Sequence, residues 1–165
     1  MTRIAALLQG IGEQPSSIAL RESAWVYPGI ETAHVLGLCL FLGLAVLLDL
    51  RLLGGALRRT PVSEFVARVM PWTWAGFALM VVTGLLLFYS DPVRFAGNVF
   101  FQIKVVLLVL AGLNAAIFHT TVYRRIASWD TSAATPRAAR VAGGVSLCAW
   151  AGIVLAGRMI AYNWF

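Results

Sequence analysis

The sequence predicts an all-α integral membrane protein, a four-helix bundle preceded by a short amphipathic helix. Of its 165 residues, 60% are hydrophobic and 12% are charged, whereas an average soluble domain has about 45–50% apolar and about 25% charged residues. The apolar residues are concentrated in four runs, and a helix that spans a bilayer needs about 20 such residues. A multi-pass membrane protein is therefore expected.

The N-terminal segment, residues 1–22, is too short and too polar to cross the membrane. Its apolar residues recur at helical spacing and are Ile4, Leu7, Leu8 and Ile11. This pattern predicts a short amphipathic helix that lies in the membrane interface. The segment also lacks the continuous apolar stretch of a secretory signal peptide, so we expect the first spanning helix to act as an uncleaved insertion signal.

The four spans are expected at about residues 23–50, 71–89, 99–123 and 141–162, and together they form one domain over residues 23–165. Trp25 and Tyr27 are typical interfacial anchors for the start of the first span. Pro71 is expected to open the second span, because proline is well tolerated in a first helical turn. Arg124 and Arg125 end the third span.

The basic residues predict the orientation of the bundle. Arginines flank the connection after the first span and the connection after the third span; they are Arg51, Arg58, Arg59, Arg68, Arg124, Arg125, Arg137 and Arg140. By the positive-inside rule these connections face the cytoplasm and both chain termini face outside. The net charge of +6 is therefore explained by topology, and nucleic acid is not expected as a partner.

Four ionisable side chains from three spans are predicted to lie in one layer near the outer surface. Glu31 and His34 are three residues apart in the first span, and His34 precedes Arg51 by 17 residues, or roughly 25 Å of helix. Arg158 follows Val141 by 17 residues and reaches a similar depth of about 25 Å. Lys104 is close to the outer end of the third span. Ionisable groups at membrane depth are costly, so a functional site is the default interpretation.

His119 is expected at a different depth. It precedes Arg124 by five residues, or roughly 8 Å of helix. The two histidines should then differ in depth by about 17 Å. Because the two axial ligands of one haem must lie at nearly the same level, the sequence predicts that His34 and His119 do not share a haem.

These observations favour a membrane haem b protein that works in electron transfer or redox sensing. Imidazole is a common axial ligand of haem iron, so His34 and His119 are the candidate metal ligands, each for its own haem. Lys104 and Arg158 could pair with the haem propionates beside Glu31. Copper is the less favoured metal, since the sequence has no Met-rich or His-rich entry motif. No catalytic residue is predicted, and the motifs of hydrolases and P-loop proteins are missing.

Two other functions remain open. Glu31, His34, Lys104 and Arg158 could form a proton or ion pathway in an oligomeric transporter, or the chain could be a structural subunit of a membrane complex. Each polar residue also has a purely structural interpretation. The histidines could form hydrogen bonds between helices, Glu31 could pair with Lys104 or Arg158, and the two cations could reach the headgroups. Asp49 and Arg51 are most simply a charge pair at a helix end.

The chain also resembles a family of small, uncharacterised bacterial four-helix membrane proteins. The resemblance extends from residue 16 onward and is carried by Trp25-x-Tyr27-Pro28-x-x-Glu31-Thr32-x-His34, Asp49-Leu50-Arg51, Pro71-Trp72-x-Trp74-x-Gly76-Phe77, Thr83-Gly84, Lys104, Asn114-Ala115-x-x-Phe118-His119 and Gly157-Arg158-x-Ile160-Ala161-Tyr162. It implies the bacterial inner membrane but no established activity. The arrangement is more distantly similar to CopD-type membrane domains and to small b-type cytochromes. The lipid bilayer, a second copy of the chain and a redox protein are the expected partners.

Overall fold

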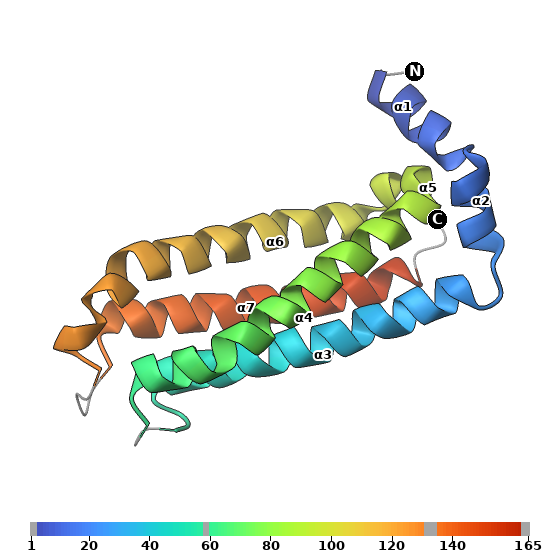
Figure 1. Ribbon diagram of the computed structural model, residues 1–165. Coiled ribbons are helices and arrows are strands. Elements are labelled where there is room, and N and C mark those ends of the chain that lie inside the picture. The colour runs from blue at the N-terminus through green and yellow to red at the C-terminus, as the bar shows by residue number, and fades with distance from the viewer. Residues whose placement is uncertain (1–2, 58–59, 131–134, 163–165) are drawn as a thin grey trace.

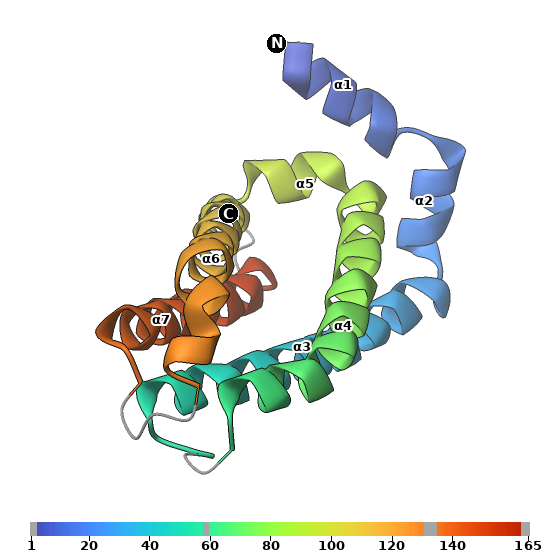
Figure 2. The same ribbon diagram turned by 60° about the vertical axis from the view of Figure 1, so that its left-hand side comes forward.

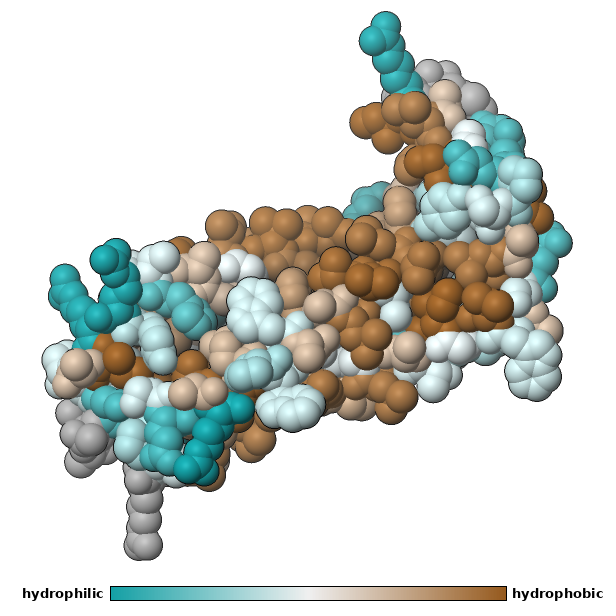
Figure 3. All heavy atoms as spheres, in the orientation of Figure 1, coloured by the Kyte–Doolittle hydropathy of each residue, from teal (hydrophilic) through white to brown (hydrophobic). Residues whose placement is uncertain are grey.

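A computed structural model describes residues 3–57, 60–130 and 135–162 of the chain, and these residues form helices and connections without strands. Four helical segments are long and apolar enough to cross a membrane: Val26–Leu53, Val62–Ser90, Val99–Ser128 and Arg137–Ile160. The prediction of an all-helical membrane chain is confirmed at this level. Figure 3 shows apolar residues over the middle of the long helices and hydrophilic residues gathered near their ends.

The long helices run side by side along the length of the molecule (Figure 1). Helix α3 (Val26–Leu53) packs against both α4 (Val62–Ser90) and α7 (Arg137–Ile160), and α7 packs against α6 (Val99–Ile117). Figure 2 shows α4 and α6 apart from each other, with the short helix α5 (Pro92–Gly97) between them at one end. We call this the α5 end. The opposite end, which carries the α3–α4 and α6–α7 connections, is called the arginine-rich end.

The second and third spans differ from their predicted limits. Helix α4 begins at Val62, and Pro71 lies inside it. The turns before Pro71 are held by packing, since Val62 and Val66 are buried in a hydrophobic cluster. This packing offsets the loss of the backbone hydrogen bond that an internal proline cannot form. Helix α6 ends at Ile117 and continues as a π-helix, η1 (Phe118–Val122), and then as a 3-10 helix, η2 (Tyr123–Ser128).

Glycines allow α3 to approach both of its neighbours closely. A Cβ atom on Gly76 of α4 would lie 2.9 Å from the backbone nitrogen of Phe41 on α3. A Cβ atom on Gly143 of α7 would lie 3.1 Å from the backbone oxygen of Asp49 on α3. Small residues at helix crossings favour this kind of packing in membranes, where apolar burial gives little driving force between helices.

The N-terminal segment forms two helices, α1 (Arg3–Gly12) and α2 (Pro15–Glu22), at the α5 end. Helix α2 caps the C-terminus of α4. The Ser17 hydroxyl donates to the backbone oxygen of Tyr89 at 2.8 Å, and Arg21 donates to that of Ser90 at 3.1 Å. The last carbonyl groups of a helix have no partner within the helix, so α2 satisfies them. The placement of α1 in a membrane interface stays a prediction.

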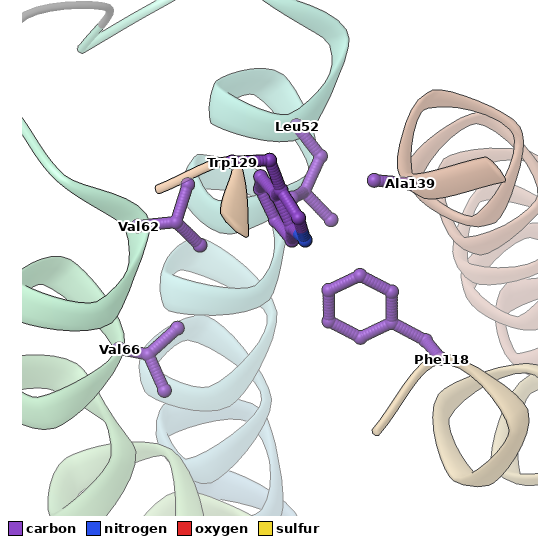
Figure 4. Close-up of a cluster of buried hydrophobic side chains, with 6 residues drawn as sticks. All are labelled: Leu52, Val62, Val66, Phe118, Trp129 and Ala139. Carbon is purple, nitrogen blue, oxygen red and sulfur yellow. The ribbon is translucent and has the colours of Figure 1, made fainter. Parts of the chain in front are cut away.

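A buried hydrophobic cluster fastens the arginine-rich end (Figure 4). It joins α3, α4, η1, α7 and the segment after η2, through Leu52, Val62, Val66, Phe118, Trp129 and Ala139. Next to Trp129, the Asp130 carboxylate accepts hydrogen bonds from the backbone nitrogen of Ser63, at 2.9 Å, and from the Ser63 hydroxyl. Asp130 therefore caps the N-terminus of α4 from a distant part of the chain.

Candidate functional site

A cavity of about 720 Å³ lies at the α5 end and is lined by residues of α3, α4, α5, α6 and α7. The structure brings four residues of the predicted layer to its walls: Glu31, His34, Lys104 and Arg158. Its size is within the range of about 300–1,000 Å³ that is usual for small-molecule and cofactor sites. Aromatic side chains from three helices add apolar wall; they are Phe88, Phe95 and Phe101.

His34 is held in one tautomer by Thr83 of α4. The imidazole Nδ1 lies 2.8 Å from the Thr83 hydroxyl, and this hydroxyl donates to the backbone oxygen of Leu79 at 2.6 Å. A hydroxyl has a single hydrogen to donate. Because that hydrogen goes to Leu79, the Thr83 oxygen accepts from His34, which must be protonated on Nδ1. Nε2 then carries the lone pair with which an imidazole binds a metal.

Gly84 makes room for the imidazole. A Cβ atom on Gly84 would lie 3.3 Å from Cε1 of His34, which is closer than most real contacts of this kind. Thr83 thus positions the imidazole ring through a hydrogen bond, and Gly84 leaves the space on the surface of α4 that the ring occupies. Composition and spacing predicted no role for either residue, because the facing of α3 and α4 is a tertiary property.

Two cations of the predicted layer reach the cavity in different ways. Lys104 lies against Gly157 of α7, and its ammonium nitrogen would be 3.6 Å from a Cβ atom at that position. Arg158 donates a hydrogen bond to the Tyr162 hydroxyl at 2.6 Å, and its guanidinium carbon lies 4.8 Å from the centre of the Tyr162 ring. Arg158 is therefore held at the mouth of the site by its own helix end.

Arg94 is a further cation on the cavity wall, and sequence reasoning missed it. Residues 90–92 are typical of a turn, and the chain turns at Asp91 between α4 and α5. The start of α5 is stabilised by a hydrogen bond from the backbone nitrogen of Arg94 to the Asp91 carboxylate at 3.3 Å. This helix crosses between α4 and α6 (Figure 2). The Asp91-Pro92 pair, a good helix start, was the available signal.

Glu31 does not neutralise the two predicted cations. Within the described residues it forms no salt bridge with Lys104 or Arg158, and it lies beside the Tyr27 hydroxyl. The structural interpretation of Glu31 as the partner of a buried ion pair is therefore not supported. Lys104 and Arg158 line the cavity without a salt bridge to Glu31 among the described residues, so this part of its wall favours an anionic group.

His119 does not line this cavity. It lies in η1, donates Nδ1–H to the backbone oxygen of Ala115 at 2.9 Å, and contacts the rings of Phe118 and Tyr123. The two histidines thus belong to different places in the fold, as their spacing predicted. Within residues 3–57, 60–130 and 135–162, no group of three or more His, Cys, Asp and Glu side chains is placed to hold a metal ion.

Comparisons with family models, with curated proteins and with solved structures gave no match to this chain. The resemblances drawn from the sequence therefore stay expectations.

Proposed function

We propose that the protein binds haem b in the cavity at the α5 end, with His34 as an axial ligand. The observation that carries this proposal is the hydrogen bond from Nδ1 of His34 to Thr83. A histidine that ligates a metal commonly donates its other ring nitrogen to a second group, which fixes both the tautomer and the ring orientation. His34 has this arrangement, in a cavity large enough for a cofactor.

The chemistry of the cavity walls fits the two ends of a haem. The macrocycle is flat and apolar, and Phe88, Phe95 and Phe101 offer aromatic surface for it. Its two propionates are anionic, and Arg94, Lys104 and Arg158 supply cations on the same walls. When bound, haem supplies one-electron chemistry. The chain contributes the axial ligand, the orientation of the haem and the charge that compensates its propionates. A membrane protein with such a haem would work as an electron carrier or a redox sensor.

His119 would hold a second haem nearer the arginine-rich end. Its Nδ1 also donates a hydrogen bond, to the oxygen of Ala115, which leaves Nε2 with the lone pair. It lies in a π-helical turn, and such turns are frequent at functional sites. The proposal for His34 does not depend on this second site.

The absorbance spectrum of the purified protein tests the proposal. We expect a Soret band and a pyridine haemochrome spectrum of haem b. A colourless protein that also fails to take up added haem would contradict it. The charged cavity would then favour the rival function, a proton or ion pathway through Glu31, His34, Lys104 and Arg158, which flux measurements in proteoliposomes with Glu31→Gln would test.

A further inference from the structure

A buried carboxyl group lies outside the cavity, on α3 near the arginine-rich end. The residue is Asp49, which is 5% exposed. It packs against α7, where a Cβ atom on Gly143 would lie 3.1 Å from its backbone oxygen, and the Ser146 hydroxyl lies near its side chain. Its other carboxyl oxygen, Oδ2, is buried and has no hydrogen-bond partner within the part of the chain that the structure describes.

The cation expected to neutralise Asp49 is directed elsewhere. The predicted charge pair with Arg51 is not formed, because Nε of Arg51 donates to the backbone oxygen of Thr60 at 2.9 Å. The positive charge of Arg51 instead acts on Asp130, whose pKa it lowers. The prediction failed because residues two positions apart do not face each other on a helix.

The described parts of the neighbouring helices bring no other charge to Asp49. On α7 the arginines Arg137 and Arg140 are exposed and precede Gly143 in the chain. On α4 the charged pair Arg68 and Glu64 is mutually satisfied and exposed, at 2.7 Å. The described surroundings of the Asp49 carboxyl are therefore one hydroxyl group and apolar packing.

We propose that Asp49 is a proton-binding site and is held as a neutral carboxylic acid. An ionised carboxylate without a cation is very costly in an apolar interior, and such groups neutralise instead. One proton on Oδ2 removes the charge that the apolar surroundings disfavour, and the other oxygen of the neutral acid can still accept a hydrogen bond from a hydroxyl such as that of Ser146. A metal ion fits less well, because one carboxyl group and one hydroxyl supply too few oxygens for Ca²⁺, which takes about 6–8.

This site is separate from the proposed haem site. Asp49 follows His34 by 15 residues on the same helix, or about 22 Å. The inference therefore holds or fails independently of haem binding, and the protein can be tested as purified, with or without cofactor.

Infrared spectroscopy of the protein in lipid tests the inference. The wild-type protein should show a carboxylic-acid C=O stretching band at neutral pH that shifts in D₂O and disappears in Asp49→Asn. Ser146→Ala should shift the band, because it removes the hydroxyl that lies near the acid. Asp130→Asn is the matched control and should leave the band unchanged.

Two results would overturn the inference. One is the absence of such a band in the wild-type protein at neutral pH, which would mean that Asp49 is ionised. The other is a band that persists unchanged in Asp49→Asn. If Asp49→Asn does not fold, the shift in Ser146→Ala still decides, since a band unaffected by Ser146→Ala does not come from Asp49.

Discussion

The imidazole of His34 on α3 donates its Nδ1 hydrogen to the Thr83 hydroxyl on α4, across 2.8 Å. This contact joins the two helices that pack most extensively in the structure. It also decides which ring nitrogen is available to a ligand, because the hydrogen of the Thr83 hydroxyl goes to Leu79. The proposed haem site depends on this relationship, and the first prediction concerns it.

Replacing Thr83 by valine keeps the shape of the side chain and removes the acceptor for Nδ1–H. We expect Thr83→Val to fold and to bind haem about 10–100-fold more weakly, which is the usual cost of losing a group that orients a metal ligand. Thr83→Ser keeps the hydroxyl and serves as the control. Titration of the apo protein with haem, followed by absorbance, measures both. Equal affinities for the two variants would show that Thr83 does not orient the ligand.

Gly76 is predicted to be intolerant of any side chain. A Cβ atom there meets the backbone of Phe41 at 2.9 Å, so Gly76→Ala must push α3 and α4 apart, at a cost of about 1–3 kcal/mol. Gly112→Ala on α6 is the matched control, because a Cβ atom on Gly112 would meet nothing within 4 Å among the described residues. Thermal unfolding in detergent should show a lower midpoint for Gly76→Ala alone. A midpoint equal to that of the control would contradict the close packing of α3 on α4.

The Asp130 cap on α4 is predicted to make stability depend on pH. Burial alone would raise the pKa of Asp130, but the hydrogen bonds from Ser63, and more weakly the charge of Arg51, lower it below its usual value. A lowered pKa in the folded state stabilises the protein above the unfolded pKa of about 3.9. This contribution is lost as the pH falls through the folded value.

Removal of the cap measures that contribution. Asp130→Ala should lose about 0.5–2 kcal/mol at neutral pH, and the difference from wild type should shrink below about pH 4. Denaturant unfolding at several pH values follows both proteins. A difference that is constant down to the lowest pH would mean that the ionised carboxylate is not the capping group.

The orientation of the chain is also testable. The arginines of the two connections at the arginine-rich end predict that this end is cytoplasmic. Alkaline phosphatase fused after residue 94, in α5, should therefore be active, because that enzyme works outside the cytoplasm, and the same fusion after residue 128 should be inactive. The reverse pattern would place the proposed haem site at the cytoplasmic side.

The sequence predicted which residues form the site better than it predicted how the helices around them pack. Helical rise alone was enough to place His34, Lys104 and Arg158 at one level, and the structure brings all three to one cavity. Counting residues also separated His119 from them. Depth along a helix depends only on spacing, so it can be read from one sequence.

Which residues of neighbouring helices face each other could not be predicted from spacing. The partnership of His34 with Thr83, the gap at Gly84 and the approach of Arg94 all depend on how α3, α4 and α5 pack. The separation of α4 from α6 depends on packing as well. Pro71 was predicted to start a helix because the buried contacts of the turns before it have no signal in spacing alone. The direction of the Arg51 side chain likewise required the folded connection.

Haem content per chain in three proteins tests the central claim most directly: the wild type, His34→Ala and His119→Ala, each purified from the same membranes. We expect haem b in the wild type, loss of the cavity haem in His34→Ala, and its retention in His119→Ala. A wild-type protein without haem, or a His34→Ala protein with the full wild-type haem content and spectrum, would contradict the proposed site.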